Sequence, residues 1–361
     1  MIRRWCAGLL VAAAAGLLLA PIRPAFVERW YSTGVYLRWQ PLVTRVSNRV
    51  PFAVFDLVLA AVLIIVLAII ALAVRTLKRG QGWRALGTAA LRLLTVSAAL
   101  YLWFALLWGI NYRRVPLLDR LELSAGAPSS EAVAALGHRA VEALNALHAE
   151  AHASGWTDPW RNGRLRDAYR RVQHGLIDGR DAMQGRPKRS VTGLYFRWAS
   201  VDGMTDPFAL EVLVNPDLLP FEQPFVTAHE WAHLAGYAQE SEASFVGFLT
   251  CMRAGVPEQY SGWLFLYWEI SSAVSPADRA SMSAALDAGP RADLARVVER
   301  VTRGQLPQLR AASWAAYDQY LKANRVAEGV RSYDAVVTLL VRATFNENWV
   351  PVRVGQPTRR R

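Results

Sequence analysis

Three long apolar runs occupy the first third of the sequence. They are WCAGLLVAAAAGLLLAPI (5–22), FAVFDLVLAAVLIIVLAIIALAV (52–74) and LGTAALRLLTVSAALYLWFALLWGI (86–110). Each is about as long as a helix needs to be to cross a bilayer core of roughly 30 Å. Hydrophobic residues make up 53% of the chain, a high fraction for a soluble protein. The sequence therefore predicts a membrane domain over residues 1–110 with three transmembrane helices.

The first run also resembles a secretory signal peptide. Arg3 and Arg4 precede it, and its middle is rich in small residues. However, no clean Ala-x-Ala cleavage site follows, and the two later runs would anchor the chain in any case. We expect three retained spans.

Basic residues around the runs bear on orientation. The loop RTLKRGQGWR (75–84) is short and basic, which favours the cytoplasmic side by the positive-inside rule. Residues after about 111 would then lie outside the cytoplasm. The segment 23–51 would lie outside as well, although it carries five arginines, so charge alone leaves the orientation open. We expect an extracytoplasmic C-terminal domain.

The remaining charges point to a membrane partner. The net charge of +12 would suit nucleic acid or anionic lipid, but the arginines are scattered and no nucleic-acid-binding motif is present. We expect a lipid bilayer as partner and no nucleic acid. Asp56 and Arg92 lie near span ends, where their side chains can reach the interface, so an intramembrane functional pair is not indicated.

Residues 111–361 have a mainly α-helical pattern. Apolar residues at three-to-four spacing after Ser129 predict one helix, and a second is expected over about 164–179. Between them and the next helical stretch, SVTGLYFRWASVDGMTDPFALEVLVNP (190–216) predicts one or two short strands. His148 and His152 stand four apart on the first helix, but no glutamate follows His148, so a metal role is not indicated.

The segment TAHEWAHLAGYAQESEAS (227–244) contains the motif H-E-x-x-H. On a helix, His229 and His233 share one face about a turn apart, so both imidazoles can reach one metal ion. Glu230 falls beside the ion and can accept a proton from a water molecule that the metal acidifies. Pro224 suits the first turn of this helix and Gly236 the position just after its end. These residues predict a catalytic zinc site.

A third protein ligand is expected, because catalytic zinc usually has three and keeps one position open. Glu240 and Glu242 are both candidates. The stretch ESEAS resembles the Glu-x-x-Ala pattern of gluzincin peptidases, although gluzincins place this glutamate further along the chain. Gly236 resembles the metzincin pattern, whose third ligand would fall at Gln239, a poor zinc ligand. We favour Glu240 and leave Glu242 open.

Four stretches are similar to an uncharacterised bacterial membrane-protein family known only as a domain of unknown function. They are LWGINYRRVPL, GLYFRW, EVLVNPDLLPFEQPFVTAHEWAHLAGYAQESEAS and YDQYLKANRVAEGVRSYDAVVTLL. The resemblance implies three N-terminal spans followed by a zincin-like domain in the bacterial inner membrane, and no established substrate. In the last stretch, Tyr320 or Tyr333 could stabilise an oxyanion, or the tyrosines could simply pack against the metal helix.

Together these features predict a membrane-anchored zinc metallopeptidase. His229, His233 and Glu240 would bind Zn²⁺, and Glu230 would act as general base on a membrane-near protein or peptide. The alternative is a catalytically inactive, metal-stabilised scaffold or partner-binding module. Intramembrane proteolysis is disfavoured because the metal helix is short and flanked by polar residues.

Overall fold

The computed structural model describes residues 2–80, 82–176, 182–324, 335–345 and 351–354. These residues are mainly helical with one small mixed sheet, as the sequence predicts. The N-terminal helices are α1 (Ile2–Leu19), α2 (Pro24–Phe26), π-helix η1 (Val27–Val35), α3 (Tyr36–Arg49), α4 (Val54–Lys78) and α5 (Gly82–Leu107). Two 3₁₀ turns follow, η2 (Gly109–Arg113) and η3 (Leu118–Arg120).

The C-terminal half holds the other elements. Its helices are α6 (Ser130–Ala153), α7 (Gly163–Leu176), α8 (Gly193–Ala199), α9 (Gln223–Leu234), α10 (Glu240–Met252), α11 (Val256–Ala273), α12 (Pro276–Ala285), α13 (Ala288–Thr302), α14 (Pro307–Ala323) and α15 (Ala335–Arg342). Its strands are β1 (Pro187–Lys188), β2 (Gly203–Asp206) and β3 (Glu211–Val214). Ser129 caps α6, because its side chain accepts a hydrogen bond from the Ala132 amide at 3.2 Å.

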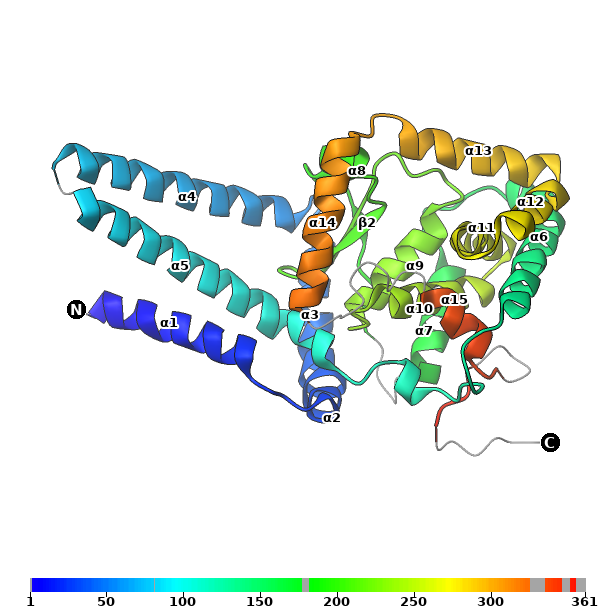
Figure 1. Ribbon diagram of the computed structural model, residues 1–361, viewed down its shortest axis with the longest axis horizontal. Helices are drawn as coiled ribbons and strands as arrows, with labels where there is room; N and C mark the ends of the chain where they lie inside the picture. The colour runs from blue at the N-terminus through cyan, green and yellow to red at the C-terminus, as the bar shows by residue number, and fades with distance from the viewer. Residues whose placement is uncertain (1, 81, 177–181, 325–334, 346–350, 355–361) are drawn as a thin grey trace.

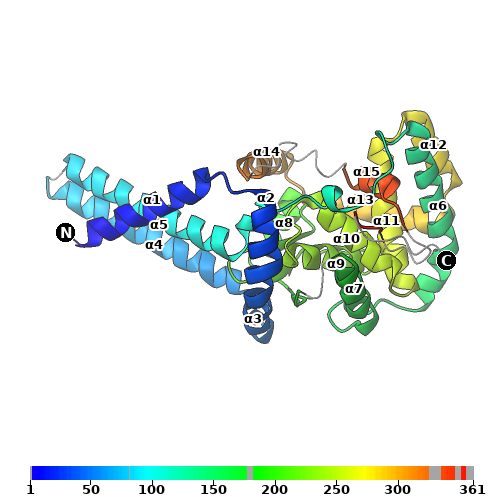
Figure 2. The same ribbon diagram turned by 90° about the horizontal axis from the view of Figure 1, so that it is seen from below.

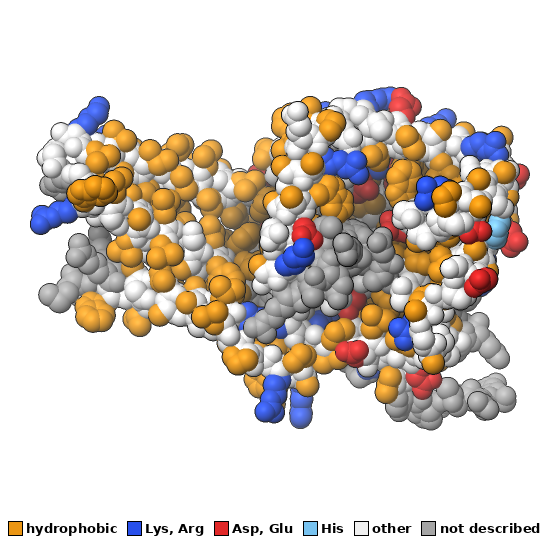
Figure 3. All heavy atoms as spheres, in the orientation of Figure 1, with side chains coloured by type: hydrophobic (Ala, Val, Ile, Leu, Met, Phe, Trp, Pro, Cys, Tyr) orange, Lys and Arg blue, Asp and Glu red, His pale blue; other side chains and the backbone are white. Residues whose placement is uncertain are grey.

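Two helices, α4 and α5, are long and apolar enough to cross a membrane. Residues 5–19 meet that test only together with residues 24–49, which follow a bend of 112°. Two of the three expected spans are thus clear, and a third is present only if the bent pair is counted as one span. Helices α1, α4 and α5 extend away from the rest of the molecule (Figure 1 and Figure 2), and Figure 3 shows hydrophobic side chains over them. Such a surface is typical of lipid-facing helices.

The segment 24–49 packs against the C-terminal half. The sequence places it in the membrane domain, as a loop between two spans. In the structure, Tyr36 donates to the Leu234 carbonyl at 2.8 Å, and Thr44 donates to the Leu210 carbonyl at the same distance. The domain boundary near residue 110 stays a prediction, and α3 makes these contacts across it.

The sheet has the order β1-β3-β2, with β1 parallel and β2 antiparallel to β3. The two strands expected within 190–216 are β2 and β3, but GLYFRW forms helix α8 instead of a strand. Gly193, Phe196 and Ala199 are buried at a spacing of three residues, which is helical and not strand-like. The sheet packs against α9, and β2 is an edge strand of the sheet.

Glu211 on β3 joins the sheet to the membrane helices. Its carboxylate accepts hydrogen bonds from the Phe55 amide in the first turn of α4, from Ser47 and from Lys188. Asp56, near the same helix end, accepts from the Ser190 hydroxyl and the Val191 amide. The start of α4 is thus fixed to the C-terminal half, and Asp56 has its partners there.

Candidate metal centre

Helix α9 begins and ends close to where the sequence predicts. Pro224 lies in its first turn, and Gly236 follows its end with a φ of +85°, a conformation that glycine adopts most readily. Trp231 is fully buried, donates to the Gly185 carbonyl at 2.7 Å, and accepts at its own carbonyl from Tyr169. This packing holds the Trp231 face of the helix in place. The two histidines of the motif lie on the opposite face.

His229, His233 and Glu240 converge at one point. Glu240 Oε2 lies 3.2 Å from His229 Nε2 and 3.4 Å from His233 Nε2. All three potential ligand atoms lie within 4.8 Å of one another. For tetrahedral zinc with bonds near 2.1 Å, ligand atoms are about 3.4 Å apart, so the observed spacing fits such an ion.

The other ring nitrogens have partners on the chain. His233 Nδ1 lies 2.7 Å from the Tyr237 carbonyl, which can only accept, so Nδ1 carries a proton and Nε2 is the ring nitrogen that could bind a metal ion. His229 Nδ1 lies 3.2 Å from the Ser244 hydroxyl. These contacts orient both rings toward Glu240, as outer partners do for metal-binding histidines.

Helix α10 directs the two candidate glutamates to different sides. Glu240 begins the helix and faces the histidines. Glu242 points elsewhere: it accepts a hydrogen bond from the Leu117 amide, and its carboxylate lies near Arg114. Gly247 allows α10 to approach α9, because a Cβ atom there would lie 3.2 Å from the His229 amide nitrogen. The third candidate, Gln239, is the N-cap of α10.

Glu230 lies beside the cluster and is buried. Thr205 on β2 donates a hydrogen bond to its Oε2 atom at 2.9 Å, and also to its backbone carbonyl. A Cβ atom at Gly203 would lie 2.7 Å from Oε1, so this strand position must be glycine for the carboxylate to keep its place. The edge strand thus positions the predicted general base.

Burial and the neighbouring charges shift the pKa values in opposite directions. Burial raises the pKa of Glu230 despite the nearby histidines. Burial would also raise the pKa of Glu240, but His233 and His229 hold it well below its usual range. Burial lowers the pKa of His233, but Glu240, Glu230 and the Tyr237 carbonyl together raise it to about 9. The Glu240 carboxyl is thus held ionised, while the pKa of Glu230 is shifted upward, in the direction that suits a general base working near neutral pH.

Tyr317, rather than the tyrosines proposed from the sequence, contacts the cluster directly. Its hydroxyl donates to Glu240 Oε1 from α14. Tyr320 is stacked on Tyr317, with ring centroids 5.8 Å apart, and also packs against Tyr112 and Phe104. Tyr333 lies outside the described residues. In the sequence, Tyr317 and Tyr320 are three residues apart, which places them on one face of a helix. This spacing could have predicted that both lie near the site.

The C-terminal end of α9 rests on the membrane side of the molecule. Trp108, just after α5, donates to the His233 carbonyl at 2.9 Å, and Tyr36 satisfies the next carbonyl, that of Leu234. Gly236 packs against Asn111, where a Cβ atom would lie 2.9 Å from the side-chain oxygen. The cluster therefore lies close to the junction between the apolar helices and the C-terminal half.

Residues 31–341 match the sequence model of a family described as "Protein of unknown function (DUF3810)". The chain belongs to this family. The match includes α3, α4, α5 and the whole metal cluster, while α1 precedes it. Comparison with curated proteins and with solved structures gave no match. The family description names no activity, so the chemistry must be argued from the site itself.

Proposed function

We propose that this protein is a membrane-anchored, zinc-dependent metallopeptidase. The observation that carries the proposal is the convergence of His229 Nε2, His233 Nε2 and Glu240 Oε2, with the Glu230 carboxylate beside them. Two imidazoles and a carboxylate are a common ligand set of catalytic zinc. Glutamate directly after the first histidine is the general base in helices of this type.

The residues present fit a zinc ion. The two Nε2 atoms face one carboxylate oxygen, and each Nδ1 atom has a partner on the chain. Glu240 is held in its ionised form, as a ligand must be. Zinc bound here would acidify a water molecule and polarise the carbonyl group of a substrate.

The chain's own residues would carry the proton steps. Glu230 would accept a proton as the water oxygen bonds to the peptide carbon, and would donate it to the leaving amine as the C–N bond breaks. Thr205 and Gly203 hold the carboxylate for both steps. The Tyr317 hydroxyl donates to Glu240 in this structure and would be a donor for a developing oxyanion if it turned toward it.

Two features support an extended peptide near the membrane as the substrate. Strand β2 lies at the edge of the sheet and contacts Glu230 through Thr205, so a peptide that paired with it would pass the general base. Trp108 and Tyr36 fix the metal helix to the membrane side of the molecule. We place the protein in the inner membrane of a bacterium, with the C-terminal half outside the cytoplasm.

A metal-stabilised scaffold is the second candidate. The low exposure of the cluster favours it: the side chains of His229, His233 and Glu240 are 13%, 8% and 7% exposed. A structural metal site is closed, whereas a catalytic site keeps one position open to substrate. In a scaffold, Tyr317 would remain on Glu240 and Glu230 would be dispensable.

Glu230→Gln in the full-length protein in detergent separates the two candidates. With a quenched fluorescent peptide library as probe, the wild type should hydrolyse peptides, and the variant should lose about 10²- to 10⁴-fold in rate while keeping its zinc. Glu299→Gln, an exposed glutamate on α13, is the matched control and should leave the rate unchanged. A zinc-loaded wild type that cleaves nothing, or activity that persists in Glu230→Gln, would reject the peptidase.

A further inference from the structure

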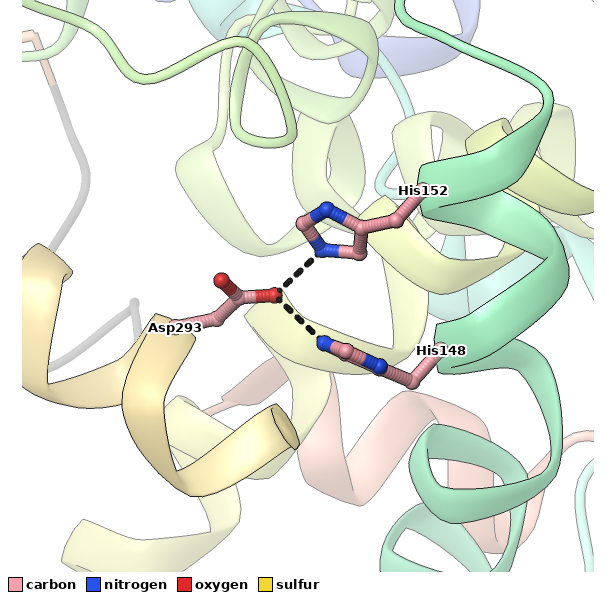
Figure 4. A group of neighbouring side chains, drawn as sticks. All are labelled: His148, His152 and Asp293. Carbon is pink, nitrogen blue, oxygen red and sulfur yellow. Dashed lines mark hydrogen bonds and ion pairs between the residues drawn. The ribbon is translucent and has the colours of Figure 1, made fainter. Parts of the chain in front are cut away.

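A second group of side chains that could hold a metal ion lies between α6 and α13. His148 and His152 on α6 both direct Nε2 toward Asp293 on α13, at 3.5 and 2.7 Å from the same oxygen, Oδ2 (Figure 4). The three potential ligand atoms lie within 4.8 Å of one another. Among the described residues, this group and the cluster at α9 are the two sets that could hold a metal ion.

The surroundings of Asp293 are unusual for a carboxylate. Its side chain is 3% exposed, and Tyr260 donates to the same Oδ2 atom at 2.7 Å. The nearest cation with a fixed charge is Arg296, at 3.8 Å from the other oxygen and itself 63% exposed. A buried carboxylate is costly unless a positive charge or a metal compensates it. The two imidazoles supply a compensating positive charge only when they are protonated. A divalent ion would supply that charge when both imidazoles are neutral.

The geometry repeats that of the cluster at α9. In both cases two histidines four residues apart on one helix face a single carboxylate oxygen from another helix. The separations of 2.7 and 3.5 Å bracket the value of about 3.4 Å for tetrahedral ligand atoms, so a small opening between His152 and Asp293 would admit an ion. Tyr260 would then orient the carboxylate from outside, as partners of metal ligands do.

We propose that His148, His152 and Asp293 bind a second divalent transition-metal ion, of the zinc or ferrous class, which fixes α13 to α6. Two imidazoles and one carboxylate suit ions of this class. Aromatic rings of Trp156, Phe221 and Tyr260 surround His152 and limit access of water on that side. The histidines remain 25% and 31% exposed, which leaves room for water as a further ligand.

Close packing supports a role in joining the two helices. Gly289 in the first turn of α13 lies against His148, where a Cβ atom would be 2.4 Å from the ring carbon Cε1. Asn145 on α6 binds the segment just before α13, at the Ala285 carbonyl and the Asp287 amide. The ion would complete this junction. We expect it to bind more weakly than the ion at α9, because no residue of the described chain accepts a hydrogen bond from Nδ1 of His148 or His152.

The test measures zinc per chain, by mass spectrometry after equilibration with zinc, in full-length protein that lacks the first cluster (His229→Ala/His233→Ala). About one ion per chain should remain, and Asp293→Asn or His152→Ala should remove it in this background. His138→Ala, a histidine of the same helix outside the group, is the control and should keep it. Added zinc should also raise the melting temperature of the background protein, but not that of its Asp293→Asn form.

A background protein that binds no zinc, or zinc that survives both Asp293→Asn and His152→Ala, would overturn the proposal and leave a hydrogen-bonded histidine–aspartate group. Asp293→Asn keeps the side-chain volume, so its folding can be checked by circular dichroism before the metal is measured. The result is independent of the peptidase proposal. Zinc lost in His152→Ala but retained without His229 and His233 would establish this site even if the first cluster proved empty.

Discussion

At the scale of single residues, a proton and a metal ion would compete for His233 in the proposed zinc site. Its Nδ1 hydrogen is committed to the Tyr237 carbonyl, so a second proton can only enter at Nε2, the atom that faces Glu240. The buried carboxylate stabilises that proton and raises the pKa of His233 to about 9. The protein without metal therefore holds the positive charge between the same two side chains that a divalent ion would join.

This competition predicts a pH dependence of zinc binding. Below pH 9 the proton on His233 must leave before zinc can bind, so the affinity should rise about tenfold per pH unit between pH 7 and 9 and then level off. With an ordinary histidine pKa, the rise would end near 6.5. Titration of the full-length protein against a chelator of known affinity in this range measures the effect. A constant affinity above pH 7 would contradict it.

The third ligand shows a limit of prediction from sequence. Glu240 and Glu242 are separated by two positions on one helix and therefore point about 200° apart around its axis. Which of them faces the histidines depends on the direction in which α10 leaves the turn at Gly236, and that direction is set by packing of distant segments such as Leu117. The motif could predict that His229, Glu230 and His233 lie together, because their relation depends on the geometry of one helix alone, and their roles stay a prediction.

We expect Glu240→Gln and Glu242→Gln to differ in metal binding. Glu240→Gln removes the charged oxygen between the two imidazoles and should weaken zinc binding by more than the roughly 10- to 100-fold typical of losing an outer partner. Glu242→Gln should change the zinc affinity less than about threefold, because its carboxylate contacts the Leu117 amide instead. Zinc affinities of both purified variants decide the matter, and equal losses would reject Glu240 as the specific ligand.

At the scale of elements, the sequence predicted those whose ends are determined locally. Helix α9 follows from Pro224 and Gly236, and the start of α6 follows from its Ser129 cap. It did not predict elements whose partners are distant. The segment 24–49 resembles a loop between spans until Tyr36 and Thr44 are seen to contact residues more than 160 positions away. Asp293 lies 141 positions from His152, so no local pattern could join them.

The small sheet depends on one buried ion pair. Lys188 on β1 and Glu211 on β3 lie 2.5 Å apart with side chains 1% and 0% exposed. Lys188→Ala would leave Glu211 buried without its cation and should lower the free energy of unfolding by about 3 kcal/mol. Lys322→Ala, which removes a partly exposed pair with Asp318, should cost less than about 1 kcal/mol. Chemical unfolding in detergent compares them, and similar losses would contradict the role of burial.

At the scale of the whole molecule, the expected orientation in the membrane rests on the position of one basic turn. The turn between α4 and α5 and the C-terminal half lie at opposite ends of the apolar helices (Figure 1). The turn is rich in basic residues, including Arg75, Lys78, Arg79 and Arg84, and the positive-inside rule favours the cytoplasm for it. The metal cluster would then lie on the outer side, close to the membrane surface, because Trp108 at the end of α5 contacts the metal helix directly.

Thiol labelling tests this orientation. In protein with Cys6→Ala, which leaves only the buried Cys251, a cysteine is placed either at Arg170 on α7 or at Arg79 after α4. In intact spheroplasts, a membrane-impermeant maleimide should label Arg170→Cys at once and Arg79→Cys only after permeabilisation. The reverse pattern would place the cluster in the cytoplasm. Because Arg79 and the C-terminal half that carries Arg170 lie at opposite ends of α4 and α5, labelling of both in intact spheroplasts would mean that α4 and α5 do not span the membrane at all.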